Sequence, residues 1–145
     1  MTDEQRKNLK ELAQRYSLTK DDFHADKRNF VMIKRCGIDK IQRQASINIE
    51  YIVEKLEKTQ HFTWVVIKAV GTMAHPDTGE MQTIESLGEA APENCTNKYF
   101  VAMAQKRAKA RVVLELTRFY EYNVYSEDEI DENEPRIQVT KPKKS

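Results

Sequence analysis

Glycine is scarce in this sequence, with four among 145 residues. There is no glycine-rich phosphate loop, no nucleophile elbow and no dinucleotide-binding fingerprint, which are short motifs that mark many nucleotide-dependent and hydrolytic enzymes. These absences weigh against those enzyme classes. We therefore expect a binding protein that is not an enzyme and that carries no cofactor.

Cysteine is also sparse. The two cysteines, Cys36 and Cys95, stand far apart in the sequence, which predicts free thiols in a reducing compartment. The three histidines lie in unrelated segments, and none repeats the spacing of a zinc site. We expect no bound metal, although a zinc site assembled from distant segments is compatible with the sequence.

Long apolar runs are missing too. No segment approaches the roughly 18 apolar residues that cross a membrane, and residues 1–7 contain no signal-peptide core. We therefore expect a cytoplasmic protein without membrane contact. The length of 145 residues predicts a single domain, which we place at residues 1–125. Residues 126–145 are expected to form a charged, disordered tail, because six of the eight residues 127–134 are acids and the last residues are basic.

What the sequence does contain is a run of helix formers over residues 97–120, with no glycine or proline inside it. The run holds one acid, Glu115, against six bases, which gives a local charge of +5 in a chain whose net charge is +1. Such a concentration of positive charge is typical of a surface that binds a polyanion, most often nucleic acid. The six bases are Lys98, Lys106, Arg107, Lys109, Arg111 and Arg118.

The same run has an apolar stripe at helical spacing, formed by Phe100, Met103, Ala104, Leu114 and Phe119. The cations project on both flanks of this stripe, so two interpretations stay open. The helix either packs on a sheet and presents its cations to a ligand, or it is buried and its long side chains merely reach back to water.

The rest of the pattern predicts an α+β fold. Apolar residues on both faces of residues 61–71 indicate a central strand, which a turn at 74–80 connects to a partner strand at 81–87. The expected core is an antiparallel sheet of about three strands, with this long hairpin and with the basic helix packed across it. The other expected elements are a short N-terminal helix at 3–16 capped by Asp3, a strand at 29–34 ended by Gly37, a helix at 38–45, a strand at 46–53 and a connection at 54–60.

The order of these elements resembles that of the single-strand-annealing recombinase superfamily, which includes the eukaryotic annealing mediator and phage proteins of the Erf, Sak and Red-beta types. The resemblance covers roughly residues 30–131. Its main part is a Gly-Glu-Ala segment after the hairpin, followed by a Lys-Arg-Ala helix. The resembling segments are residues 66–72 with the turn to Gly79, residues 85–94, residues 103–114 and the acidic residues 125–131.

This resemblance implies a homo-oligomer whose copies assemble side by side into a ring or filament, with single-stranded DNA in a basic groove along the outside. Proteins of this kind pair complementary strands in recombination and DNA repair, in phages among other sources, and they need no nucleotide. Lys106, Arg107, Lys109 and Arg111 match the basic segment of the phage helix. The complete set of residues expected to bind nucleic acid adds Lys34, Arg35, Lys40, Arg43, Lys68, Lys98 and Tyr99.

The mechanism expected of such a groove is neutralisation of phosphates, which makes binding steeply dependent on salt. Tyr99, Trp64 or Tyr51 would add about 1–3 kcal/mol for each base on which they stack, but Trp64 is better assigned to the core. Replacing Arg107 and Arg111 together with alanine is predicted to weaken DNA binding and to leave the fold intact.

Two other functions stay open from the sequence. A protein-interaction module would use the basic helix to bind an acidic protein partner in place of DNA. A metal-dependent enzyme would use Glu85 and Glu89 as paired acids, which strand alternation puts on one face only if the strand runs through Gly88.

Overall fold

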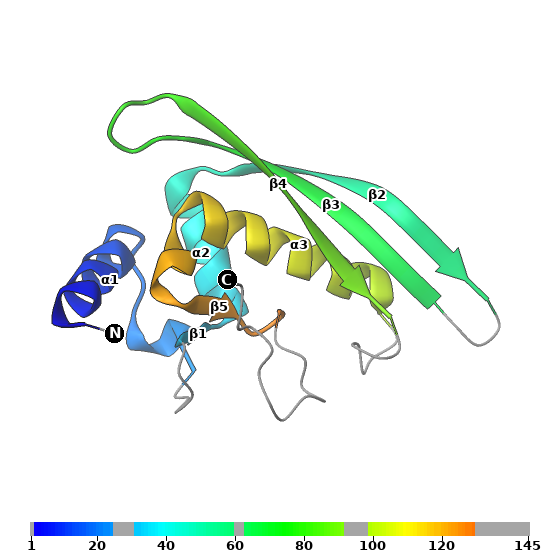
Figure 1. Cartoon of the computed structure of the whole chain (residues 1–145), viewed down its shortest axis with the longest axis horizontal. Helices are drawn as coiled ribbons and strands as arrows, with labels where there is room; N and C mark the ends of the chain where they lie inside the picture. Colours follow the sequence, from blue (N-terminus) through cyan, green and yellow to red (C-terminus); the bar gives the residue numbers. More distant parts are fainter. Residues whose placement is uncertain (1, 25–30, 60–62, 92–98, 130–145) are drawn as a thin grey trace.

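The computed structural model describes residues 2–24, 31–59, 63–91 and 99–129. Figure 1 shows a sheet of long strands with one long helix crossing beneath it. The elements in chain order are α1 (Asp3–Arg15), the 3-10 turn η1 (Lys20–Asp22), β1 (Val31–Ile33), α2 (Arg35–Ala45), β2 (Asn48–Lys58), β3 (Thr63–Ala74), β4 (Met81–Ala90), α3 (Phe100–Leu116), the 3-10 turn η2 (Phe119–Tyr122) and β5 (Val124–Ser126).

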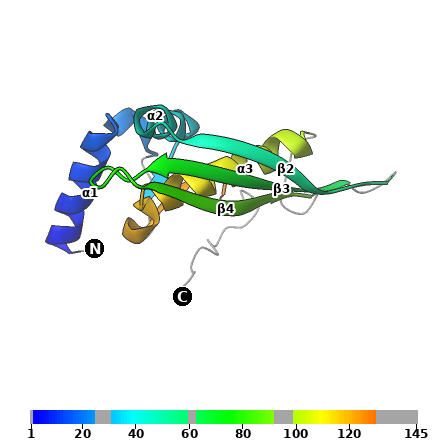
Figure 2. The ribbon, with the colours of Figure 1, turned by 90° about the horizontal axis from the view of Figure 1, so that it is seen from above.

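The main sheet is antiparallel with the strand order β2-β3-β4, so β3 is central and the other two strands are edges. The helix α3 packs across one face of this sheet, and the other described helices lie on that side or beyond the sheet's end (Figures 1 and 2). On the far side of α3, the short strands β1 and β5 pair in parallel, with Val31 opposite Val124. The predicted α+β fold, with a three-stranded antiparallel sheet and a helix across it, is confirmed.

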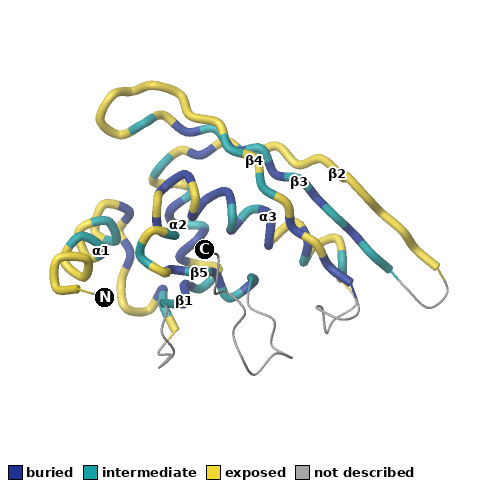
Figure 3. Tube along the Cα trace, viewed as in Figure 1, coloured by how far each residue is buried: buried dark blue, intermediate teal, exposed yellow. Residues whose placement is uncertain are grey.

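The alternation of burial along β3 shows which face of the sheet covers the core. Val65, Ile67 and Ala69 are buried on the face that contacts α3, whereas Trp64 and Val66 are half-buried on the opposite face (Figure 3). The prediction of a central strand is confirmed. The assignment of Trp64 to the core needs correction, because no described helix covers the face on which it lies.

The helix α3 approaches the sheet closely because the facing residues are small. A Cβ atom on Gly88 of β4 would lie 2.2 Å from the carbonyl oxygen of Ala104 and 2.4 Å from the backbone nitrogen of Ala108. Both atoms belong to the backbone of α3, so the two elements fit at this distance only with glycine at position 88. The strand β4 itself continues through Gly88 to Ala90.

Two boundaries around the first sheet strand differ from those predicted. The strand β2 continues through the expected connection to Lys58, with a register shift between Val53 and Lys55. Such an irregularity is common at a sheet edge, where charged residues are tolerated. Gly37 does not end a strand but lies in the first turn of α2, where a Cβ atom would meet the Ile33 side chain at 2.6 Å.

The helix ends also differ from the predictions. Thr2, and not Asp3, caps α1, through a capping box with Gln5. The long basic helix begins at Phe100 and ends at Leu116 within the predicted run of 97–120, and the cap expected at residues 96–97 lies outside the described residues.

A buried carboxylate joins η1 to α2. Asp22 is 2% exposed, and its carboxylate accepts hydrogen bonds from Lys40 Nζ at 2.8 Å, from the backbone nitrogen of Thr19 at 2.8 Å and from Cys36 Sγ at 3.3 Å. Burial on its own raises the pKa of this carboxyl group, but the bond with Lys40 and the other donors outweigh that effect, so the pKa is lowered. Asp22 therefore stabilises the fold above its unfolded pKa, and that contribution is lost as the pH falls through its native pKa.

We expect Asp22→Asn to lower the free energy of unfolding by about 2 kcal/mol at neutral pH, because Lys40 and the other donors then lose a buried, charged acceptor. Asp21→Asn removes the same charge from an exposed neighbour and should change this free energy by less than about 0.5 kcal/mol. Urea unfolding over a pH series checks the prediction, since the difference from wild type should shrink as the pH falls toward the native pKa of Asp22. A difference that stays constant with pH would contradict it.

Candidate nucleic-acid interface

Two arginines of α3, Arg107 and Arg111, reach the edge strand β4. Arg107 is 8% exposed and donates to the carbonyl oxygens of Glu89 and Asp128, both at 2.8 Å. Arg111 donates to the carbonyl oxygen of Leu87 at 2.5 Å. Because Leu87 and Glu89 are two residues apart on β4, their carbonyl groups point to the same, outer edge of the sheet. The two guanidinium groups therefore cover part of an otherwise unpaired sheet edge.

The acidic segment after β5 packs against these arginines. Glu129 lies 3.6 Å from Nε of Arg111, accepts from the backbone nitrogen of Ser126 at 2.8 Å and accepts from the Tyr120 hydroxyl. Burial raises the pKa of Glu129, and burial together with this carboxylate raises the pKa of Tyr120 well above its ordinary value. Residues 126–129, which the sequence assigned to the tail, thus belong to the folded part, and the rest of the tail lies outside the described residues.

Ion pairs also engage two bases of α2, Arg35 and Lys40, and one base of α3, Lys109. Nε of Arg35 lies 2.7 Å from the Asp128 carboxylate, and Lys40 pairs with Asp22 as described above. Lys109 of α3 contacts Asp39 of α2 at 2.5 Å, which ties the two helices together. These cations are already neutralised by the chain's own carboxylates, so phosphates would have to compete for them.

Lys68 lies on the face of the sheet opposite α3, between acids of both neighbouring strands. Its Nζ is 3.6 Å from Glu85 of β4 and 4.0 Å from Glu54 of β2. Glu85 and Glu89 share this face, because β4 continues through Gly88. Across the described ranges, no cluster of three or more histidine, cysteine, aspartate or glutamate residues is arranged to hold a metal ion.

The predicted cations thus divide into two groups. Lys34, Arg43 and Lys106 form no salt bridge within the described residues, and they lie on α2, at its cap or on α3. Lys98 falls outside the described residues. The chain itself holds the other six by carboxylates or carbonyl oxygens, namely Arg35, Lys40, Lys68, Arg107, Lys109 and Arg111.

Two exposed tyrosines lie on the side of the sheet that α3 covers. Tyr51 of β2 is 36% exposed on the α3 side of the sheet, where it bonds with Gln105 of α3; burial and the nearby Asp39 raise its pKa. Tyr99, at the start of α3, is 74% exposed. Within the described residues, Tyr51 and Tyr99 are the exposed aromatic side chains on this side, whereas Trp64 lies on the other face of the sheet.

Charge divides between the helices and the sheet. The helices α2 and α3 together carry seven bases and two acids, whereas the three strands of the main sheet carry five acids and three bases. The concentration of positive charge predicted for α3 therefore belongs to a helical side that includes α2. Three acids packed against these helices, Asp22, Asp128 and Glu129, offset part of this positive charge. The sheet's other face would repel a polyanion more strongly than this side does.

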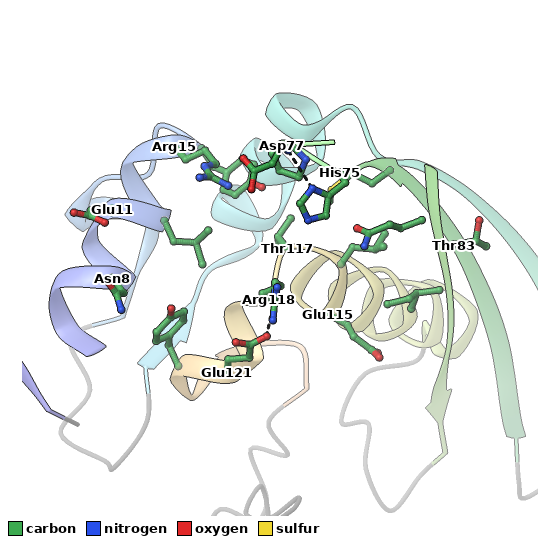
Figure 4. Close-up of a pocket in the computed structure, with 18 residues that line it drawn as sticks. Asn8, Glu11, Arg15, His75, Asp77, Thr83, Glu115, Thr117, Arg118 and Glu121 are labelled. Atoms are coloured by element: carbon green, nitrogen blue, oxygen red, sulfur yellow. Dashed lines mark hydrogen bonds and ion pairs between the residues drawn. The ribbon is translucent and has the colours of Figure 1, made fainter. Parts of the chain in front are cut away.

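A cleft at the other end of the molecule was not predicted from the sequence. It has a volume of about 870 Å³ and lies between α1, the end of α3 and the tip of the β3–β4 hairpin (Figure 4). Its charged walls are partly paired, since Arg118 contacts Glu121 at 2.6 Å. Separate sequence segments form this cleft, and none of them carries a motif that would have indicated it.

The comparisons with known proteins give no family. No family model matches the chain, and no curated protein matches it. Among solved structures, a candidate lipoprotein of Caulobacter crescentus CB15 aligns over 62% of this chain and 82% of its own, at 11% sequence identity and a TM-score of 0.27. That similarity is too low to support an inference about fold or function. Within the described ranges, no helix is both long and apolar enough to span a bilayer.

Proposed function

We propose that this chain binds single-stranded DNA and promotes strand annealing in recombination, acting in the cytoplasm as an oligomer of identical copies. The observation that carries the proposal is the group of exposed or half-buried cations on the packed helices α2 and α3, Lys34, Arg43 and Lys106, which form no salt bridge within the described residues. Cations without a carboxylate partner bind phosphate without first breaking an internal ion pair.

Exposed tyrosines on the same side of the sheet as these cations favour single strands over duplex DNA. Tyr51 and Tyr99 lie on the same side of the sheet as α3, and aromatic rings bind unpaired bases by stacking. The bases of a duplex already stack on each other and offer no free ring face along their length. We therefore assign phosphate contacts to the helix cations, and base stacking to the tyrosines.

The small number of unpaired cations in the described part of each copy supports the proposal of an oligomer. Three phosphate contacts give weak binding, whereas several copies on one strand act together and raise the affinity. An open edge supports such assembly: β2 is an edge strand of 11 residues, and Val53 and Leu56 on it are 58% and 57% exposed. A long edge strand with exposed apolar side chains is a site where another copy can pair.

The variant Arg43→Ala with Lys106→Ala tests this assignment. We expect weaker binding to a fluorescent single-stranded oligonucleotide, and a plot of log affinity against log salt whose slope is smaller by about 1.4, because each lost phosphate contact on a single strand accounts for about 0.7. Lys7→Ala with Lys10→Ala is the matched control, since it removes two exposed charges from α1. Equal effects of the two double variants on anisotropy titrations would contradict the assignment of the cations.

A further inference from the structure

The face of the main sheet opposite α3, here called the outer face, is uncovered in the described part of the chain (Figure 2). Strand register places alternate residues of β2, β3 and β4 on it. Leu87 and Ile52, for example, are 50% and 43% exposed on this face. Its apolar members are Ile52, Trp64, Val66, Val70, Met81 and Leu87.

The charged residues of the outer face are mostly acids. It carries five, which are Glu50, Glu54, Glu57, Glu85 and Glu89, against two bases. Both bases are already engaged. Lys55 lies over the Trp64 ring, 4.4 Å from its centre, and Lys68 lies between Glu54 and Glu85. Such a face repels DNA and is complementary to a segment that combines positive charge with apolar side chains.

The chain itself contains a segment with this chemistry near its C-terminal residues. Residues 136–144 carry four bases, Arg136, Lys141, Lys143 and Lys144, and no acid. Ile137 and Val139 alternate with polar residues, and prolines at 135 and 142 flank this stretch, which is a pattern typical of a short added strand. Residues 130–145 lie outside the described part of the chain.

The attachment point of this segment is close enough to reach the outer face. Glu129 contacts Arg111, which also donates to the Leu87 carbonyl oxygen at the edge of β4. The side chain of Leu87 itself lies on the outer face. Arg136 follows Glu129 by seven positions, and a chain of seven residue steps spans up to about 24 Å. Strands lie about 4.8 Å apart, so this span is enough to pass around β4 and reach β3.

We propose that residues 136–144 of this chain dock on the outer face, with Arg136 and the lysines paired to its glutamates and with Ile137 and Val139 against its apolar residues. The outer face is then a protein-docking surface, separate from the helical side assigned to DNA. This inference does not depend on DNA binding.

The single tryptophan of the chain reports on this docking directly. Trp64 lies on the outer face, so a docked segment shields it from water and from a quencher. In the full-length chain without DNA, replacing Arg136, Lys141, Lys143 and Lys144 by serine should shift Trp64 emission to longer wavelength and increase quenching by acrylamide. High salt should shift the wild-type protein in the same direction.

Two further measurements make the result specific. A synthetic peptide of residues 135–145, added to the four-serine variant, should restore the wild-type emission, and the same peptide with Ile137 and Val139 replaced by serine should not. A control chain with Lys7→Ser and Lys10→Ser on α1 should keep the wild-type emission. Equal emission and quenching in the wild type and the four-serine variant would overturn the proposal, as would an emission change that only single-stranded DNA produces.

Discussion

Arg107→Ala is expected to lower the free energy of unfolding by about 3 kcal/mol, which is a large effect for a charged residue. The guanidinium group donates to two carbonyl oxygens, on Glu89 and Asp128, and thereby joins α3 to the edge of β4 and to the segment after β5. Alanine leaves two acceptors without this donor, a buried one on Asp128 and a partly exposed one on Glu89, and hydrogen bonds from charged groups contribute about 1.5–3 kcal/mol each. Urea unfolding, followed by circular dichroism, measures the change.

Lys106→Ala is the matched control for this prediction. Lys106 precedes Arg107 on the same helix, carries the same charge and is exposed, so its replacement should change the free energy of unfolding by less than about 0.5 kcal/mol. If Arg107→Ala unfolds at the same urea concentration as the wild type, Arg107 does not stabilise the fold. Its sequence-based assignment to the phosphate-binding surface would then stand.

This prediction replaces the one made from the sequence for Arg107 and Arg111. There, the double alanine variant was expected to keep its fold and to lose DNA binding. With Arg107 buried and with Arg111 bonded to Leu87 and close to Glu129, we now expect the double variant to be unstable. Loss of DNA binding in that variant would then report on folding and not on phosphate contacts.

Gly88→Ala is expected to destabilise the fold by about 3 kcal/mol, at the upper end of the usual cost of overpacking. The new methyl group would stand 2.2 Å and 2.4 Å from the backbone atoms of Ala104 and Ala108, which no side-chain rotation can move. The helix α3 would have to shift away from β4, with loss of packing along the sheet. Thermal unfolding checks the prediction, because a change of 1 kcal/mol moves the midpoint by about 2–4 °C in a chain of this size.

Gly71→Ala is the comparison for Gly88→Ala. Gly71 lies on the same face of the sheet, but a Cβ atom there would meet side-chain atoms, Cγ1 of Val112 at 2.2 Å and Cδ1 of Leu116 at 3.1 Å. Side chains shift more readily than a helix backbone, so we expect a loss of about 1 kcal/mol. Equal losses at the two glycines would show that the close approach of backbone atoms does not limit the packing of α3.

The fold was predicted best where the sequence pattern is local. The alternation along β3 and the turn at residues 74–80 were sufficient to predict the hairpin of β3 and β4. The extension of β2 to Lys58 was missed because its last residues are charged, and a strand at a sheet edge exposes such residues without cost to the core. The β1–β5 pair joins segments about 90 residues apart, and no local pattern indicates such a pairing.

The candidate site was predicted only in part, because charge along a helix does not show where the counter-charges lie. The excess of bases on α3 was correctly read from its sequence. The acceptors of Arg107 and Arg111 come from residues 87–89 and 128–129, which the fold brings to the helix. Asp39, the partner of Lys109, lies 70 residues away in sequence. The sequence of the helix alone therefore does not distinguish arginines that bond within the fold from cations that are available to a ligand.

Binding of the wild-type chain to a single-stranded oligonucleotide, measured over a range of salt concentrations, tests the central claim most directly. Three phosphate contacts in each copy, at about 0.7 each, predict a slope of log affinity against log salt of about −2 or steeper, and steeper still if several copies bind one strand. No binding at low salt, or an affinity that does not change with salt, would contradict the claim that this protein binds single-stranded DNA.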